Sequence, residues 1–291
     1  MSVHSLLEDL WSSTDAEARI ADDPVAWPRR YSALRDVEIA SFWASTLAYG
    51  RVDLFRRTLS ALFAVFDARG GPAAFVESFD PTVDGSLLWG IHYRFHTHAD
   101  LVVLIHMLKR IYRRADSLED LLLVGLAQER TLAAGLNALI EALRVEAMSA
   151  AGVASYEHLS RGVRYSLPRP ADGSACKRWC LAVRWLVRPT HEGVDLHRWR
   201  RVSTSLLVIP VDTHVLRLSQ FLGLTRRSTA SWRTALEITA SLARFDGSDP
   251  VRFDFALAHH GISGACLGYR AEPVCRACVL QRACAAPAGA G

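Results

Sequence analysis

Lysine is almost absent from this chain. Lysine and arginine together number 34, but only Lys109 and Lys177 are lysines. Codon bias toward arginine accounts for the average, but it does not explain why lysine remains at these two positions. A lysine can lose its proton and act as an amine nucleophile, which arginine cannot do. The two lysines are therefore the first residues to consider for chemistry.

Long apolar runs are also missing. The longest, such as Leu101–Ile105 and Leu121–Leu126, are too short to span a bilayer. No apolar stretch follows a basic N-terminal segment, so we expect no secretory signal. Hydrophobic residues make up 50% and charged residues 22% of the chain, as in soluble globular proteins. The net charge of +4 permits nucleic-acid binding without requiring it. We expect a soluble monomer of the cytoplasm, associated with the nucleoid.

Sustained alternation of apolar and polar residues, the pattern of half-buried strands, does not occur. Caps and apolar stripes instead predict helices at residues 37–49, 101–114, 129–149, 174–188, 195–203, 213–222, 231–244 and 250–260. Asp36 is expected to cap the first of these. Asp249 and Pro250 are expected to begin the last, which ends before Gly261. The fold class is therefore predicted to be all-α.

Four of the six cysteines stand close together, as Cys266-x8-Cys275-x2-Cys278-x5-Cys284. In a reducing compartment this spacing suits metal ligation better than a disulfide framework. An iron–sulfur cube needs four thiolates, which a short irregular loop can supply. Structural zinc sites usually present two close ligand pairs, and only one C-x2-C pair is present. We expect a [4Fe-4S] cluster, with zinc or unligated thiols as the alternatives.

A second informative segment is Pro210–Val215, which reads Pro-Val-Asp-Thr-His-Val. Proline ends any preceding helix, and Asp212 stands where the next helix begins. Backbone N–H groups and the helix dipole stabilise a carboxylate at that position as the anion. Taken alone, the segment indicates an ordinary N-cap.

The Val-Asp-Thr-His segment, the helix that ends in His260-Gly261 and the cysteine loop together resemble helix-hairpin-helix DNA glycosylases of the endonuclease III branch. The resemblance covers about residues 205–284. In that branch the aspartate is the catalytic carboxylate, and cysteines spaced C-x6-C-x2-C-x5-C hold a [4Fe-4S] cluster. Here the last two intervals match, and the first is x8. The resemblance implies a catalytic role for Asp212, a cluster on the four cysteines and a two-lobed fold.

The nucleophile region is similar to a different branch. Endonuclease III carries its lysine after a Leu-Pro-Gly-x-Gly hairpin, which does not occur here. Lys177 instead lies in the first turn of an expected helix, 35 positions before Asp212. This interval resembles the archaeal GO glycosylase, which excises 8-oxoguanine with a Lys/Asp pair and lacks the cysteine loop. The resemblance implies that Lys177 attacks C1′ to form a Schiff base while Asp212 stabilises the charge on the sugar. The alternative is a surface lysine.

We expect two helical lobes with a cleft between them, which would receive a nucleotide that has left the base stack. One lobe would comprise 36–205, with Lys177. The other would comprise 1–35 and 206–291, with Asp212 and the cysteines. The candidates for contact with DNA are Arg51, Arg94, Arg226, Arg227 and His260.

The segments Leu47–Arg51 and His92–Phe95 resemble a bacterial family of uncharacterised proteins. The predicted function is a DNA repair glycosylase acting on double-stranded DNA with a damaged base, 8-oxoguanine first among the candidates, and with AP lyase activity. A non-catalytic Fe–S protein that binds DNA on the same scaffold is the alternative from another class. A zinc-stabilised helical interaction protein is the third.

Overall fold

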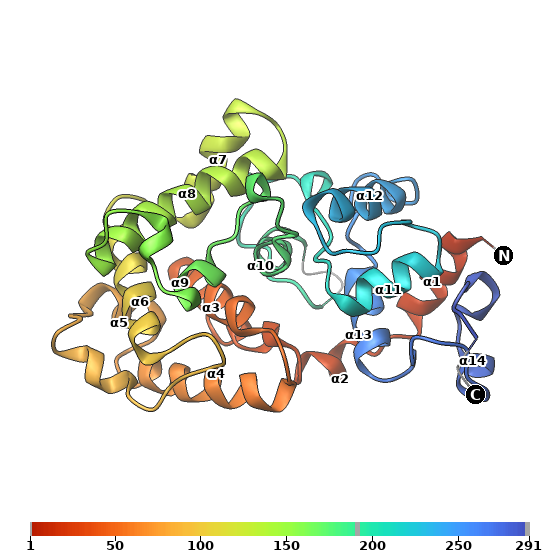
Figure 1. The fold of residues 1–291 in the computed structure, drawn as a ribbon, viewed down its shortest axis with the longest axis horizontal. Helices are drawn as coiled ribbons and strands as arrows, with labels where there is room; N and C mark the ends of the chain where they lie inside the picture. Colours follow the sequence, from red (N-terminus) through yellow and green to blue (C-terminus); the bar gives the residue numbers. More distant parts are fainter. Residues whose placement is uncertain (1, 190–192, 289–291) are drawn as a thin grey trace. The chain divides into compact units, whose positions relative to one another are not determined.

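The computed structural model describes residues 2–189 and 193–288, and its regular elements there are helices (Figure 1). Extended pairing in these residues is limited to two isolated β-bridges, Tyr93 with His96 and Arg270 with Ala288. The all-α prediction is confirmed. No single helix in the described ranges is long and apolar enough to cross a membrane. One bent pair of helices, α4 (Val52–Asp67) and α5 (Pro72–Ser78), has that length and composition when the two are taken together.

The chain divides into two compact units. Unit 1 comprises residues 1–21, 173–184 and 203–291, and unit 2 comprises residues 22–172 and 185–202. This division differs from the expected one in three places, of which the smallest is that residues 203–205 belong to unit 1. Segment 22–35 belongs to unit 2, and segment 173–184 belongs to unit 1. Lys177, which was expected on the central lobe, therefore shares a unit with Asp212.

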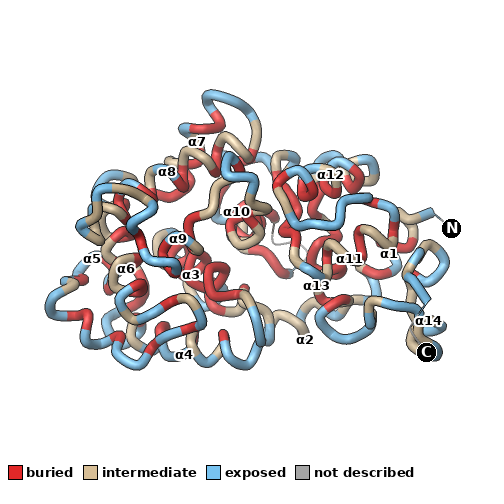
Figure 2. The backbone as a smooth tube through the Cα atoms, viewed as in Figure 1, coloured by how far each residue is buried: buried red, intermediate tan, exposed pale blue. Residues whose placement is uncertain are grey.

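Unit 2 is built around α3 (Leu34–Leu47), in which every residue from Val37 onward is buried (Figure 2). The other α-helices of this unit are α4 (Val52–Asp67), α5 (Pro72–Ser78), α6 (His98–Tyr112), α7 (Leu118–Gln128), α8 (Leu132–Ala151) and α9 (Arg161–Ser166). Its short 3-10 turns are η1 (Pro24–Ala26), η2 (Pro28–Arg30), η3 (Asp84–Leu88), η4 (Tyr156–His158) and η5 (Pro170–Asp172). Helix α8 packs along both α6 and α7, and α3 contacts α4 and α5.

Glu38 is a fully buried carboxyl group within the core of unit 2. It accepts hydrogen bonds from the hydroxyls of Ser117 at 2.5 Å and Tyr112 at 2.9 Å, and from the indole N–H of Trp199 at 2.7 Å. The backbone N–H of Leu118, at the start of α7, donates to it at 3.1 Å. One side chain of α3 thus joins α6, the start of α7 and the 185–202 segment, and its burial is tolerated because donors surround it.

Unit 1 contains α1 (Val3–Ser12), α2 (Ala16–Ile20), α11 (Thr213–Phe221), α12 (Trp232–Ala243), α13 (Asp254–Ile262) and α14 (Val274–Ala277), with the 3-10 turns η7 (Thr204–Leu206) and η8 (Gln281–Ala283). Helix α10 (Lys177–Val187) begins in unit 1 and ends in unit 2. Within unit 1, α13 contacts both α1 and α11. A Cβ atom at Gly261 would lie 2.5 Å from Cβ of His214, so glycine allows the close approach of α13 to α11.

Three of the expected helix features are wrong. Residues 195–203 form no helix, because the backbone N–H groups of Leu196 and Trp199 donate to carbonyls at the end of α10, at 2.7 and 2.8 Å. Helix α13 begins at Asp254, not at Pro250, and Gly261 lies inside it because of the contact with α11. Asp36 does not cap α3; its Oδ1 accepts the N–H of Ala73 at 2.8 Å, in the first turn of α5.

Candidate functional site

Lys177 and Asp212 lie next to each other in unit 1. Nζ of Lys177 is 3.4 Å from Oδ2 of Asp212, and the two side chains are 30% and 18% exposed. Lys177 is the first residue of α10, and Asp212 is the N-cap of α11. Residues that are 35 positions apart in the sequence therefore form an ion pair at the starts of two helices. The amine and the carboxylate named from the sequence are close together and partly accessible to solvent.

The two oxygens of Asp212 have different partners. Oδ1 accepts the backbone N–H groups of His214 at 2.9 Å and Val215 at 2.8 Å, which is the usual geometry of an N-cap. Oδ2 is the oxygen that faces Lys177. Helix capping therefore fixes the orientation of the carboxylate and directs its second oxygen toward the amine.

The other lysine has a structural partner. In unit 2, Nζ of Lys109 donates to the carbonyl oxygen of Phe79 at 2.8 Å, and Phe79 is the C-cap of α5. A cation at the C-terminal end of a helix satisfies a carbonyl group and complements the helix dipole. This contact assigns Lys109 to the fold and makes Lys177 the stronger candidate for a nucleophile.

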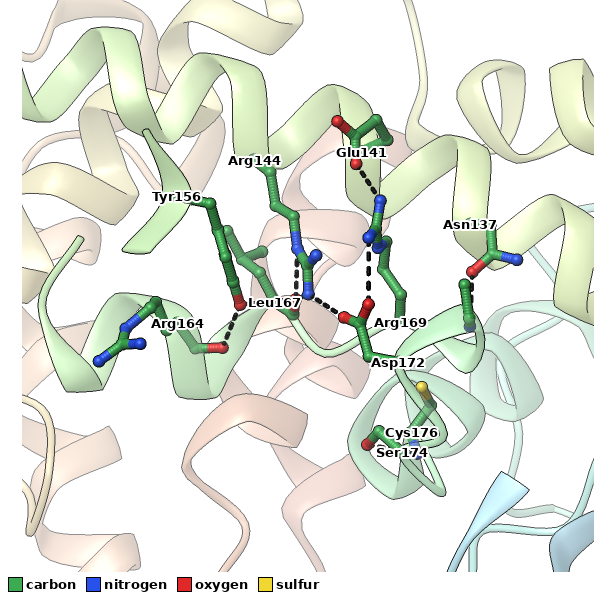
Figure 3. A network of polar contacts seen from close by, with 11 residues as sticks. Asn137, Glu141, Arg144, Tyr156, Arg164, Leu167, Arg169, Asp172, Ser174 and Cys176 are labelled. Atoms are coloured by element: carbon green, nitrogen blue, oxygen red, sulfur yellow. Dashed lines mark hydrogen bonds and ion pairs between the residues drawn. The ribbon is translucent and has the colours of Figure 1, made fainter. Parts of the chain in front are cut away.

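A polar network in unit 2 anchors the chain that leads to Lys177 (Figure 3). Nε and Nη2 of Arg144 donate to the carbonyl oxygen of Leu167 at 2.9 and 2.6 Å, and Nη2 also donates to Asp172 at 2.5 Å. Arg169 donates to the same carboxylate at 3.0 Å. Burial opposes the ionisation of Asp172, but the hydrogen bonds from the two arginines outweigh it and lower the pKa of this carboxyl group. An ionised Asp172 thus ends the segment five positions before Lys177.

The four C-terminal cysteines line one pocket of unit 1. Its apolar wall includes Leu218, Phe221 and Leu222, from α11 and its C-cap, and His260 also lines it. Nε2 of His260 is 3.4 Å from Sγ of Cys278. The backbone N–H of Ala271 donates to Sγ of Cys275 at 3.3 Å. His260, which the sequence suggested for contact with DNA, therefore lies beside the thiols.

The donor set of this pocket fits a metal cluster in kind and number. Burial raises the pKa of the Cys278 and Cys284 thiols, and the neighbouring thiols raise it further. Such thiols need a bound cation to stabilise them as thiolates. Among the residues that the structure describes, no three His, Cys, Asp or Glu side chains are grouped as ligands of one metal ion. A cluster held by Cys266, Cys275, Cys278 and Cys284 stays a prediction.

Helix α11 joins the two features, because Asp212 caps its N-terminus and residues of its last turn line the pocket. Nη2 of Arg217, on the same helix, donates to the carbonyl oxygen of Cys266 at 3.3 Å and lies 3.4 Å from Nδ1 of His214. The N–H of Ala285 donates to the carbonyl of Phe221 at 2.9 Å. Sequence analysis did not find Arg217, since its partner is 49 positions away and no local pattern marks it.

The four arginines expected to contact DNA are all exposed. Arg51 and Arg94 belong to unit 2, whereas Arg226 and Arg227 belong to unit 1. Arg51 pairs with the aspartate two positions on at 2.9 Å, and Arg227 pairs with Glu237 at 2.7 Å. Within each unit the structure leaves the arginines at the surface, where two of them already have an acidic partner.

The comparisons with known proteins found a family model but no individual relative. Neither the curated proteins nor the solved structures contain a match to this chain. One family model, described as "Protein of unknown function (DUF2400)", matches residues 23–263. The matched segment contains Lys177 and Asp212 and ends before Cys266. Since it spans 241 of the 291 residues, from 23 to 263 inclusive, the chain belongs to the family that this description names.

Proposed function

We propose that this protein is a DNA glycosylase with AP lyase activity, in which Lys177 is the nucleophile and Asp212 the catalytic carboxylate. The observation that carries the proposal is the 3.4 Å approach of the Lys177 amine to Oδ2 of Asp212. One of only two lysines in the chain lies beside the carboxylate of the Val-Asp-Thr-His motif. This contact matches the Lys/Asp pair that the sequence resemblance implies.

The chemistry follows from the two groups. The ammonium group of Lys177 first gives up a proton to solvent, and the resulting amine attacks C1′ of the damaged nucleotide. The bond from C1′ to the base nitrogen breaks, and the base leaves with that electron pair and takes up a proton. Positive charge develops on the deoxyribose as that bond lengthens, and the anionic oxygen of Asp212 stabilises it. The amine nitrogen then loses a proton, and its electron pair breaks the bond from C1′ to O4′, which takes up a proton, so that the sugar opens to an iminium ion. Loss of a proton from C2′ then expels the 3′ phosphate and nicks the strand.

The cysteine pocket has a supporting role in this proposal. Cys266, Cys275, Cys278 and Cys284 would hold a [4Fe-4S] cluster, which supplies a rigid, four-point attachment for the C-terminal loop when it is bound. The pocket wall is formed partly by α11, whose first turn is capped by Asp212. These thiols and Arg217 therefore fix the far end of the helix that orients the carboxylate.

The substrate of the proposal is double-stranded DNA with a damaged base, and 8-oxoguanine is the first choice because of the resemblance to the archaeal enzyme. The other function to weigh is DNA binding without catalysis, in which Lys177 and Asp212 form only an ion pair between two helix starts. A partly exposed ion pair of this kind contributes about 0–1 kcal/mol to stability. The two functions differ in whether the amine becomes covalently attached to DNA.

Trapping with borohydride decides between them. The protein is incubated with duplexes that contain 8-oxoguanine, uracil, an oxidised pyrimidine or a mismatch, and the reduced covalent adduct is resolved by denaturing electrophoresis. Lys177→Arg keeps the charge but cannot form the imine, so it should lose the adduct and the nick while retaining affinity for DNA. Lys109→Arg is the matched control and should trap like the wild type. Equal trapping by Lys177→Arg refutes the assignment of the nucleophile.

A further inference from the structure

Two segments that the proposed chemistry does not use lie against each other in unit 2. The first is Tyr49-Gly50, within the segment Leu47–Arg51. The second is the turn Tyr93–His96, which overlaps the segment His92–Phe95. The Tyr49 hydroxyl is 3.0 Å from Nδ1 of His96, and the Tyr93 hydroxyl donates to the carbonyl oxygen of Tyr49. A Cβ atom at Gly50 would lie 2.6 Å from Nη1 of Arg94. Gly50 has a φ of +80°, a conformation that residues with a side chain rarely adopt.

Three aromatic rings form a half-buried cluster at this junction. The rings of Tyr49 and Phe95 are nearly parallel, with centroids 6.1 Å apart and an angle of 14° between them. Tyr165, the last but one residue of α9, packs edge-on against both, at 5.0 and 5.1 Å. None of the three rings belongs to the buried core. The aromatic cluster of Tyr49, Phe95 and Tyr165 is thus a partly accessible surface.

Exposed guanidinium groups lie over the aromatic cluster. The guanidinium carbon of Arg161 is 3.7 Å from the centroid of Phe95, and that of Arg94 is 5.6 Å from Tyr49. Both arginines are exposed. Arg94 has a φ of +51°, a left-handed conformation that is rare for a residue with a side chain. Backbone strain of this kind is retained mainly where the position of a side chain matters for function.

We propose that the aromatic cluster, together with Arg94 and Arg161, binds an unpaired nucleotide of a nucleic-acid strand. Aromatic rings and planar guanidinium groups are the surfaces on which unpaired bases stack. The positive charge of the same arginines complements the phosphates on either side of the base. The base stacks on the outer face of the Arg161 guanidinium group, whose inner face lies on Phe95, while Arg94 contacts the backbone.

This site shares no residue with the proposed catalytic pair, since it consists of residues of unit 2 and contains neither Lys177 nor Asp212. Binding there therefore does not depend on glycosylase activity. The binding test below measures no base excision. Failure of the catalytic proposal therefore leaves this inference standing, and failure of this inference leaves the catalytic proposal standing.

The test measures the dissociation constant for a fluorescent single-stranded oligonucleotide and for a matched strand whose central nucleotides are abasic, at several salt concentrations. Stacking contributes about 1–3 kcal/mol per base, so the wild type should bind the complete strand on the order of tenfold more tightly. Phe95→Leu keeps apolar bulk without the ring and should abolish that difference. Circular dichroism and thermal melting verify that each variant is folded.

Variants of Arg161 separate charge from stacking. Arg161→Lys should keep the salt dependence but lose the preference for the complete strand, because lysine has no planar face. Arg161→Gln should lose the preference and also reduce the slope of log K against log salt by roughly 0.7. Arg130→Gln removes an exposed arginine from the turn between α7 and α8 and is the matched control.

The inference is overturned if the wild type binds the abasic strand as tightly as the complete one, since the site then recognises only charge. It is also overturned if Arg161→Lys keeps the full preference, or if Arg130→Gln weakens binding as much as Arg161→Gln. Competition with polyglutamate is the last test. If polyglutamate displaces the complete strand at the same concentration of negative charge as unlabelled nucleic acid does, the inference is overturned and the site binds acidic peptides instead.

Discussion

Asp212→Asn is the substitution that best separates capping from catalysis. Oδ1 of Asp212 accepts the N–H groups of His214 and Val215, and Oδ2 faces Lys177. Asparagine caps helices about as well as aspartate, so the bonds to Oδ1 are retained. What is lost is the negative charge, together with its attraction to the Lys177 ammonium and to the positive end of α11.

Loss of these contacts in Asp212→Asn should reduce the free energy of unfolding only slightly. A charge at a helix N-terminus contributes about 0.3–1 kcal/mol, and a partly exposed ion pair contributes about 0–1 kcal/mol. Together they correspond to a decrease of a few degrees in Tm for a protein of this size. The cost to catalysis is larger, because removal of one group that stabilises the charge of the transition state reduces the rate by about 10²–10³, or roughly 2.7–4 kcal/mol.

The assay is excision of the damaged base under single-turnover conditions, at a temperature well below the Tm of both proteins. Asp15→Asn is the control, because Asp15 is the N-cap of α2 in the same unit and accepts the N–H of Ala18. It should have nearly the wild-type rate. A folded Asp212→Asn protein that excises at nearly the wild-type rate refutes the reasoning and identifies Asp212 as an ordinary N-cap.

Two further predictions concern the cysteine pocket and the core of unit 2. Protein purified without oxygen should contain iron and sulfide, and Cys275→Ser should lose both along with thermal stability. Cys180→Ala, which removes a buried thiol outside the pocket, should keep the iron; zinc in place of iron contradicts the prediction. Burial raises the pKa of Glu38 despite its four hydrogen-bond donors, so the folded state holds this proton more tightly than the unfolded state. The free energy of unfolding should therefore decrease as the pH rises above the unfolded value of about 4.3, as followed by urea denaturation, whereas Glu38→Gln should lack that decrease.

The helices with strong local signals were predictable from the sequence. Apolar periodicity and caps place α11 and α12 within one residue of their observed bounds. The errors occur where tertiary contacts override local preference. Residues 195–203 have a helical pattern, but Trp199 donates its indole N–H to Glu38, 161 positions away. Gly261 resembles a helix terminator, but it lies inside α13 because His214 approaches it closely.

The sequence by itself determined the fold class and the chemical types of the site: a rare lysine, a carboxylate at a helix start and four closely spaced thiols. These are local properties, set by composition and by short-range spacing. Only the tertiary structure decided that the Lys177 amine lies beside Asp212. It also decided that Lys109 donates to a carbonyl at the end of a helix and that the rings of Tyr49 and Phe95 lie close together. Contacts of this kind depend on how helices far apart in the chain pack, because the energy that selects them is buried area and hydrogen bonding summed over a whole unit.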